Sequence, residues 1–402
     1  MIELKKDLMK RGDRMEYLLM NKDKAVLSLE MEDGVIISVN ELFSAEYMPV
    51  GIYSDKKKEL TSALRKWWAG RRIPASRISF TEELAAISKY FDTPDDPAYL
   101  SEKCRGLSLS DQYWINPLDS PLKWSDINFF ENDFSEDMGK ILFDNAQIDN
   151  PDMMSPDNTS DGNLRKKWKI INGKRCLIKG YTLPYKQEPF NEKIASVICR
   201  ELGIKSYVPY SLIFENNEPA CVCDNFITPE TEFVPANSVM SLKKRDSNTS
   251  LYNHYINICR DIGVTGISDR IDEMLVLDFL IGNYDRHFRN FGLIRNVETL
   301  EFVGAAPIFD NGTSLKFNTE TNEIFFEPEY MLKSKPFKST HHEQIRLVRN
   351  PERFKISGLR NCTDEIRDIL DTGSVISAKR VDFLCDFLNQ RITALDTAFS
   401  NQ

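Results

Sequence analysis

The chain has 402 residues, of which 41% are hydrophobic, 28% are charged and 11% are aromatic, and its formal net charge is −9. This composition excludes wholesale disorder, and the length predicts about two or three domains. Because an acidic chain repels nucleic acid at long range, the charge disfavours generic binding to a phosphate backbone, and we expect no direct contact with nucleic acid.

The sequence carries no signal for a membrane or for secretion. The N-terminal stretch MIELKKDLMKRGDRMEY lacks an apolar core of signal-peptide length, and no run of about 20 apolar residues occurs. The eight cysteines are scattered and form no CxxC pair, which favours reduced, buried thiols over disulfides or a zinc site. We therefore expect a cytoplasmic protein that makes no contact with a membrane.

Residues 1–100 mix strand-like and helix-like patterns and predict an α+β region without a chemical motif. Two strands are expected at Ala25–Glu30 and Val35–Val39, joined as a hairpin. Short amphipathic helices are expected at Glu59–Ala69 and Phe80–Phe91. The role of this region is packing, substrate choice or partner binding, and its residues do not decide among these.

Residues 101–150 carry several aromatic residues and two prolines. We interpret this stretch as a connecting strap that packs on a neighbouring domain, while a cofactor platform built from the same aromatic rings stays open. The next segment, Asn150–Gly162, is rich in Asp, Asn, Ser and Pro and predicts a long polar loop. The basic residues after it fit either a solvated hairpin face or a phosphate-binding surface: Arg165, Lys166, Lys167, Lys169, Lys174 and Arg175.

After this loop the pattern is β-rich, and after about residue 250 it becomes helical. Trp168–Ile171 and Lys174–Lys179 predict the two strands of a hairpin, because Asn172-Gly173 between them accepts the positive φ angles of a tight turn. Lys179 ends the second strand. A lysine in this place is ordinarily a solvated residue at the end of a strand.

A helix is predicted to follow, beginning at Pro189 and ending at the cap residue Gly203. Glu192 lies in its first turn, where the helix dipole alone would favour a carboxylate. A strand lysine followed by a helix glutamate is also how kinases hold nucleotide, since the lysine binds phosphate oxygens and the glutamate fixes the lysine. Lys179 and Glu192 are therefore a candidate catalytic pair.

Two more strands are expected, at Tyr207–Phe214 and Pro219–Phe226. In a bilobal kinase, a strand like the second one enters the hinge between the lobes, where backbone N–H and C=O groups hydrogen-bond adenine. We therefore place an adenine-binding hinge at Asn225, Phe226 and Ile227.

The helical part opens with a strongly apolar helix, Asp272–Leu280, that ends at Gly282. The segment Asn283–Gly292 (NYDRHFRNFG) is charged and polar, so it must be exposed or hydrogen-bonded. Its D-x-x-x-x-N spacing puts Asp285 and Asn290 on one short loop. There, an acidic residue can accept the proton of an attacking hydroxyl, and an amide oxygen can bind Mg²⁺.

A hairpin of Phe291–Ile294 and Leu300–Val303 is expected next, followed by an apolar run that ends at Asp310. Asp310 is the second, stronger candidate ligand for the metal. His287, inside the preceding loop, is expected to brace that loop rather than act as a general base. Each piece is common by itself, whereas the order of lysine strand, glutamate helix, D-R-H-x-x-N loop, hairpin and I-F-D-x-G is much more specific.

These motifs resemble the HipA-like Ser/Thr kinases of bacterial toxin–antitoxin systems. The resemblance covers roughly residues 155–400 and rests on N-Y-D-R-H-x-x-N-F-G around Asp285, P-I-F-D-N-G around Asp310 and E-P-F-N-E ending at Glu192. The D-R-H-x-x-N loop is shared with phosphoinositide 3/4-kinases, so it indicates a kinase superfamily rather than one substrate. Unlike eukaryotic protein kinases, the chain has no H-R-D motif, and D-N-G replaces D-F-G.

The resemblance implies an α+β, bilobal protein-kinase-like fold with a β-rich small lobe, a helical large lobe and an additional N-terminal α+β region. The domains expected are residues 1–100, the strap at 101–150, the small lobe at 151–228 and the large lobe at 229–402. The resemblance also implies ATP and Mg²⁺ as cofactors and a protein substrate. By analogy alone, it adds an antitoxin-like or DNA-binding regulatory partner.

The same resemblance implies that Asp285 is the catalytic base, that Asn290 and Asp310 bind metal, and that Lys179 contacts phosphates. It also implies a loop near residues 159–163 that covers the phosphates, with the cofactor-binding residues Thr159, Ser160, Asp161 and Gly162. Autophosphorylation of Thr159 or Ser160 is the regulation expected from it.

Two other interpretations stay open. A small-molecule or lipid kinase would share the D-R-H-x-x-N loop, although no basic amphipathic helix suited to a membrane surface is present. A nucleotide-binding regulatory module without catalysis would share the fold, although the complete set of lysine, glutamate, aspartate and asparagine argues against it.

Overall fold

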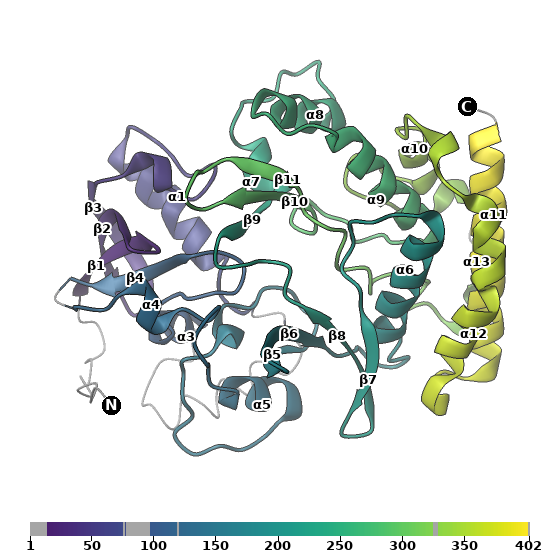
Figure 1. Ribbon diagram of the computed structural model, residues 1–402, viewed down its shortest axis with the longest axis horizontal. Helices are drawn as coiled ribbons and strands as arrows, with labels where there is room; N and C mark the ends of the chain where they lie inside the picture. Colours follow the sequence, from purple (N-terminus) through teal and green to yellow (C-terminus); the bar gives the residue numbers. More distant parts are fainter. Residues whose placement is uncertain (1–13, 75–76, 78–96, 119, 325–328, 401–402) are drawn as a thin grey trace. The chain divides into compact units, whose positions relative to one another are not determined.

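The computed structural model describes residues 14–74, 77, 97–118, 120–324 and 329–400. The chain divides into two compact units, residues 1–170 and residues 171–402. Both units contain helices and strands, which confirms the predicted α+β class (Figure 1). The helix expected at Phe80–Phe91 lies outside the described residues.

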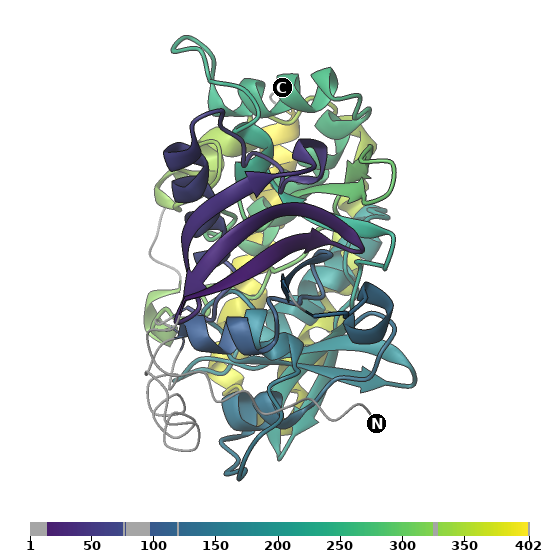
Figure 2. The same cartoon turned by 90° about the vertical axis from the view of Figure 1, so that its left-hand side faces the viewer.

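The first unit is built on a twisted antiparallel sheet with the strand order β3-β2-β1-β4, whose first three strands are purple in Figure 2. Its strands are β1 (Arg14–Asn21), β2 (Lys24–Glu32), β3 (Val35–Leu42) and β4 (Tyr113–Pro117). Strands β2 and β3 confirm the predicted hairpin, and their turn residues Asp33 and Gly34 both have positive φ. Strand β4 comes from the aromatic-rich stretch and pairs with β1.

Several aromatic residues of this unit are core residues, among them Trp68, Trp114 and Phe129. Trp114 on β4 is fully buried, and its indole N–H donates to the carbonyl oxygen of Lys22 at 2.8 Å. Leu60, Leu64 and Trp68 form the buried stripe of α1, which confirms the predicted amphipathic helix. The other described elements are a 3₁₀ turn (Ala45–Tyr47), α1 (Lys57–Ala69), α3 (Pro97–Lys103), α4 (Trp124–Ile127), α5 (Asp137–Asp144), a second 3₁₀ turn (Pro156–Thr159) and β5 (Lys166–Ile171).

The second unit opens with the sheet order β6-β8-β7, against which α6 packs. These elements are β6 (Lys174–Lys179), α6 (Glu188–Leu202), β7 (Ser211–Glu215) and β8 (Glu218–Asp224). As predicted, Asn172 and Gly173 before β6 have positive φ, and Gly203 ends α6 in the left-handed conformation. Strand β7 is shorter than expected, because Tyr207 pairs in a single parallel bridge with Ile308 instead.

A second sheet, with the order β11-β10-β9, follows. Its strands are β9 (Thr231–Pro235), β10 (Gly292–Asn296) and β11 (Phe302–Ala305). Strands β10 and β11 confirm the predicted hairpin. A Cβ atom at Gly292 would lie 2.1 Å from the carbonyl oxygen of Val234, so only glycine lets β9 approach the end of the D-R-H-x-x-N loop this closely.

Helices make up most of the rest of this unit. They are α7 (Ala236–Met240), α8 (Leu251–Asp261), α9 (Ile267–Ile281), α10 (His341–Ile345), α11 (Ile356–Leu359), α12 (Thr363–Asp371) and α13 (Ala378–Ser400). Helix α9 confirms the predicted apolar helix and ends at Gly282. Helix α13 lies beside α9, α11 and α12 (Figure 1). No described helix has the length and apolar character needed to cross a membrane.

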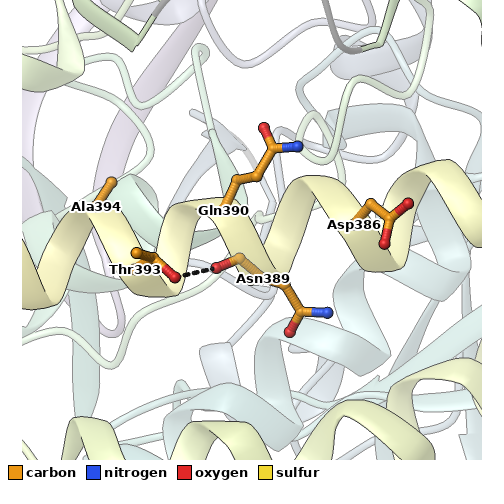
Figure 3. Close-up of a pocket in the computed structure, with 5 residues that line it drawn as sticks. All are labelled: Asp386, Asn389, Gln390, Thr393 and Ala394. Carbon is orange, nitrogen blue, oxygen red and sulfur yellow. Dashed lines mark hydrogen bonds between the residues drawn. The ribbon is translucent and has the colours of Figure 1, made fainter.

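Helix α13 has one buried and one exposed face. Its buried side includes Val381, Leu384 and Leu388. On the other side, Asp386 and Asn389 stand along a hollow in the surface, and the hydroxyl of Thr393 donates to the Asn389 carbonyl oxygen at 3.0 Å (Figure 3). None of the residues predicted to form the functional site lines this hollow.

Candidate active site

The side chain of Lys179 is enclosed by two carboxylates. Its Nζ donates to Oδ1 of Asp310 at 2.6 Å and to Oε1 of Glu192, and only 3% of Lys179 is exposed. Burial lowers the pKa of the Lys179 ammonium, but the negative charges of Asp310 and Glu192 outweigh it and hold the pKa well above its usual range. Lys179 is therefore a charged residue inside the fold rather than a solvated one at a strand end.

Glu192 makes a second link to the segment that carries Asp310. Its Oε2 accepts the backbone N–H of Asn311 at 2.9 Å, while Oε1 faces Lys179, and the residue is fully buried. Asn191, beside it on α6, donates from Nδ2 to the Gly312 carbonyl oxygen at 2.8 Å. Helix α6 thus binds residues 310–312 through the side chains of Asn191 and Glu192. A favourable interaction of Glu192 with the helix dipole would not by itself require these contacts.

Asp310 adopts a backbone conformation that few residues tolerate. Its φ is +59°, in the left-handed region, where aspartate and asparagine are the least strained residues after glycine. Its side chain is 36% exposed. Two contacts stabilise this conformation: Lys179 donates to the Asp310 carboxylate, and Glu192 accepts the backbone N–H of Asn311.

The loop after α9 is ordered by a fully buried arginine. Arg286 donates from Nε and Nη2 to the two carboxylate oxygens of Asp278, each at 2.9 Å. It also donates to the Asn290 carbonyl oxygen at 3.0 Å, to Oδ1 of Asn311 at 2.7 Å and to the Phe309 carbonyl oxygen. One guanidinium group therefore joins the D-R-H-x-x-N loop to the residues on both sides of Asp310.

Asp285 stands at the exposed side of this loop, and its side chain is 35% exposed. Its Oδ1 accepts the ammonium of Lys335 at 2.9 Å, and its backbone oxygen accepts Nδ2 of Asn290 at 3.3 Å. The Asp285 N–H donates to Oδ1 of Asn283 at 3.0 Å. His287 accepts the Arg289 N–H at 3.3 Å, a contact of the bracing kind expected for it.

The residues predicted to form the hinge lie just after β8. The Asn225 N–H donates to the Arg175 carbonyl oxygen at 2.7 Å, which extends the pairing of the strand by one residue. Oδ1 of Asn225 accepts the Ile227 N–H at 3.2 Å. The Phe226 ring packs at 5.4 Å between centroids on Phe309, the residue before Asp310. The predicted hinge is therefore packed on the segment that carries Asp310.

The four residues expected to cover phosphates belong to the first unit. The Thr159 hydroxyl donates to the Leu107 carbonyl oxygen at 2.7 Å, and Arg77 donates to the carbonyl oxygens of Ser160 and Gly162. Thr159 and Ser160 are buried, whereas Asp161 is exposed and accepts the Gly162 N–H at 2.7 Å. In this conformation the Thr159 hydroxyl is occupied by its own unit.

The donors predicted to bind metal are one carboxylate, Asp310, and one amide, Asn290. Within the described residues, no group of three or more His, Cys, Asp or Glu side chains is arranged to hold a metal ion. Mg²⁺ commonly takes one or two protein carboxylates and completes its octahedral shell with substrate phosphates and water. The donors therefore fit an ion bound together with a triphosphate better than an ion held by the protein alone.

Three residues near the site, Asp278, Arg286 and Lys335, were not predicted as site residues from the sequence. Arg286 stands inside the D-R-H motif, so the motif itself was a signal for it. No sequence pattern pointed to Asp278 on α9 or to Lys335, because a lone charged residue in a helix or loop is ordinarily solvated.

A strand lysine, a helix glutamate and an aspartate after a hairpin, tied to a D-R-H-x-x-N loop, define a kinase-like constellation. No family model matches the chain. Over 140 residues, 33% of this chain and 42% of the relative, the sequence is 31% identical to the serine/threonine-protein kinase CtkA of Helicobacter pylori. This match confirms the predicted resemblance to serine/threonine kinases over those residues, and it spans less than half of that protein.

Two solved structures are similar to the chain. One is a crystal structure of the Helicobacter pylori proinflammatory kinase CtkA, with a TM-score of 0.43 and 22% identity, covering 59% of this chain and 93% of that one. The other is from the Shewanella oneidensis MR-1 toxin–antitoxin complex of HipA, HipB and operator DNA, with a TM-score of 0.48 and 12% identity, covering 95% and 97% of the two chains.

Proposed function

We propose that the chain is a HipA-like kinase that transfers the γ-phosphoryl group of ATP to a serine or threonine hydroxyl of a protein. The observation that carries this proposal is the buried Lys179, clamped between Glu192 and Asp310. A buried lysine with two carboxylates is expensive to desolvate, so a role in binding anionic phosphate gives it a reason to be there. The sequence match to a serine/threonine kinase supports the same activity.

In the proposed reaction Asp285 is the general base. As the acceptor hydroxyl oxygen forms its bond to the γ-phosphorus, the bond from that phosphorus to the β–γ bridging oxygen breaks, and ADP leaves. The hydroxyl proton goes to the Asp285 carboxylate. Lys179 would neutralise charge on the α- and β-phosphates, and Glu192 would keep Lys179 in place.

The metal would lie between Asp310, Asn290 and the phosphates. When bound, Mg²⁺ supplies positive charge that offsets the charge developing on the β- and γ-phosphate oxygens. Asp310 would orient one ligand oxygen toward it, held by the Lys179 contact at 2.6 Å. The side-chain amide of Asn290 would take a similar role, since its Nδ2 donates to the Asp285 carbonyl oxygen at 3.3 Å and Arg286 holds the Asn290 backbone oxygen.

The remaining cofactor contacts are assigned by the resemblance. Asn225, Phe226 and Ile227 would receive adenine, and the segment Thr159–Gly162 would cover the phosphates. Autophosphorylation of Thr159 or Ser160 requires this segment to leave its present contacts, since the Thr159 hydroxyl is bound to the Leu107 carbonyl oxygen. An antitoxin-like or DNA-binding regulatory partner, and a cytoplasmic location, belong to the same proposal.

The test is incubation of the full chain with Mg²⁺, γ-labelled ATP and a cell lysate, followed by identification of labelled proteins. Wild type, Asp285→Ala and Asp310→Ala are compared with Asp386→Ala, a change of an exposed aspartate on α13. We expect wild type and Asp386→Ala to label serine or threonine residues, and the other two to lose labelling while keeping the wild-type circular dichroism spectrum.

Other outcomes would change the assignment. Equal labelling by wild type and by both active-site variants would contradict the proposed catalytic centre. Label in extracted lipids or in a small molecule, with none in protein, would favour the alternative kinase class. Binding of Mg-ATP without any turnover, under Mg²⁺ or Mn²⁺, would favour a regulatory nucleotide-binding module.

A further inference from the structure

A short loop, residues 334–340, is held by hydrogen bonds to the buried side chain of Gln344. Gln344 on α10 is 2% exposed, and its Oε1 accepts the N–H groups of Phe337 at 3.0 Å and Lys338 at 3.1 Å. Its Nε2 donates to Oγ of Ser334 at 2.7 Å and to the Lys335 carbonyl oxygen. The backbone at Lys335 is therefore held by a buried amide, unlike that of an ordinary surface loop.

The same loop is packed against the D-R-H-x-x-N loop. The Phe337 ring lies 5.8 Å from the Phe288 ring and 5.9 Å from the Phe291 ring, centroid to centroid, and both contacts are T-shaped. Phe288 and Phe291 follow Asp285 by three and six positions. Two anchors, Gln344 and Phe337, thus fix where Lys335 stands relative to the Asp285 loop.

From this support Lys335 reaches the carboxylate of Asp285. Its Nζ lies 2.9 Å from Oδ1, with side-chain exposures of 51% for Lys335 and 35% for Asp285. Within the described part of the chain, no residue donates a hydrogen bond to Oδ2 of Asp285. The carboxylate therefore has one oxygen paired with a cation, while the other accepts no hydrogen bond from the described residues.

We propose that Lys335 is a positioning residue for phosphoryl transfer, a role that rests on the proposed kinase function. By holding Oδ1, the ammonium fixes the rotation of the Asp285 carboxylate and leaves Oδ2 to accept the proton of the acceptor hydroxyl. A general base must stand within hydrogen-bond reach of that proton, and small misplacements of such groups are costly in rate. The proton goes to Oδ2, and Lys335 keeps its own protons throughout.

An exposed ion pair of this kind contributes little to stability, so removing Lys335 should leave the fold intact. Two lysines of the same stretch, Lys333 and Lys338, are also exposed and make no contact with Asp285, which gives matched controls. The variants are Lys335→Met, Lys335→Arg, Lys333→Met and Lys338→Met in the full chain.

The first experiment measures ADP formation and label transfer with Mg-ATP and casein as the acceptor protein. We expect Lys335→Met to lower kcat about tenfold or more, with the KM for ATP within about twofold of wild type, because the lysine acts on the base and not on the nucleotide. Lys335→Arg should recover most of the rate, since it restores a cation. The two control variants should match wild type.

The second experiment is a double-mutant cycle of Lys335→Met with Asp285→Asn, read as the residual rate of ADP formation at high enzyme concentration. If Lys335 acts through Asp285, its substitution changes nothing further once the carboxylate has been removed. Wild-type kcat in Lys335→Met, or an equal loss in the Asp285→Asn background, would overturn the assignment while leaving the kinase proposal standing. Absence of transfer by wild type itself would overturn both.

Discussion

Arg286 and Asp278 form an ion pair in which neither side chain has any exposed surface, with Nη2 2.9 Å from Oδ1. Asp278 lies near the end of α9, and Arg286 lies in the loop that follows, so the pair holds that loop to its helix. The same guanidinium also donates to Asn290, one candidate metal ligand, and to Asn311, the residue after the other candidate ligand, Asp310. Two segments separated by a hairpin are thus oriented by one buried cation.

Breaking this pair should destabilise the protein strongly. Asp278→Asn leaves the buried guanidinium without its counter-charge, and the loss expected for one partner of a buried pair is about 3–5 kcal/mol in the free energy of unfolding. Urea denaturation measures it. Asp382→Asn breaks the exposed pair with Arg367 and is the control, expected to change stability by less than about 1 kcal/mol. A loss at Asp278 no larger than that of the control would show that the network is not needed for folding.

Lys179 and Glu192 should be energetically coupled. Lys179→Met leaves the fully buried Glu192 carboxylate without its cation, and we expect a loss of about 3 kcal/mol in the free energy of unfolding. Glu192→Gln in the Lys179→Met background removes the unpaired charge and should recover part of that loss. A double-mutant cycle by urea denaturation should give a coupling energy above about 1 kcal/mol, and additive losses would argue against the pair.

Arg380 on α13 should control the order of the segment after Asp310. It donates to the carbonyl oxygens of Lys316 at 2.8 Å and Thr319 at 2.8 Å, and to Oε1 of Gln187 on α6 at 2.8 Å. In Arg380→Met these acceptors lose their donor, so we expect faster hydrogen–deuterium exchange in peptides that cover residues 315–324. Peptides from β1 and β2 of the first unit are the internal control. Unchanged exchange in 315–324 would mean that the segment is held by other contacts.

Asp157 should make stability depend on pH. Burial raises the pKa of its carboxyl to about 7, against a usual value of 3.8, so the folded protein keeps the proton at pH values where the unfolded chain has lost it. The resulting stabilisation is complete below about pH 4, is lost as the pH rises toward 7, and then stays constant. The total change is roughly 4 kcal/mol at about 1.4 kcal/mol per pH unit.

The comparison that isolates this effect is wild type against Asp157→Asn. The amide cannot ionise and still accepts the Trp168 N–H that Asp157 accepts at 2.9 Å. Between pH 4.5 and 7.5, the free energy of unfolding of wild type should fall relative to that of the variant. A constant difference across this range would place the carboxyl pKa near its usual value.

Much of the secondary structure followed from local patterns. The apolar spacing and the glycine caps of α6 and α9 predicted both helices, and Asn172-Gly173 predicted a turn in which both residues have positive φ. The D-x-x-x-x-N spacing did place Asp285 and Asn290 on one loop, joined by a hydrogen bond of 3.3 Å. Such features depend on neighbours within a few residues, and the sequence displays them directly.

The remaining features depend on partners far away in the chain. Strand β4 joins β1 across more than 90 positions, and nothing in Tyr113–Pro117 names that partner. Lys179 meets Asp310 across 131 positions, and Lys335 meets Asp285 across 50. Hydrophobic periodicity tells which face of an element is buried but not what covers it. The roles of Asp278 and Lys335 therefore emerged only from the structure, as did the partners of Arg286, although Arg286 itself stands inside the D-R-H motif.

The central claim is transfer of the terminal phosphoryl group at the Lys179–Asp310 site. Its most direct measurement compares labelling of protein by γ-labelled and by α-labelled ATP, with wild type beside Asp310→Ala. Incorporation from γ-labelled ATP alone, lost in Asp310→Ala, is the predicted result. Incorporation from α-labelled ATP would mean nucleotidyl transfer instead, and γ-label transfer undiminished in Asp310→Ala would contradict the proposed site.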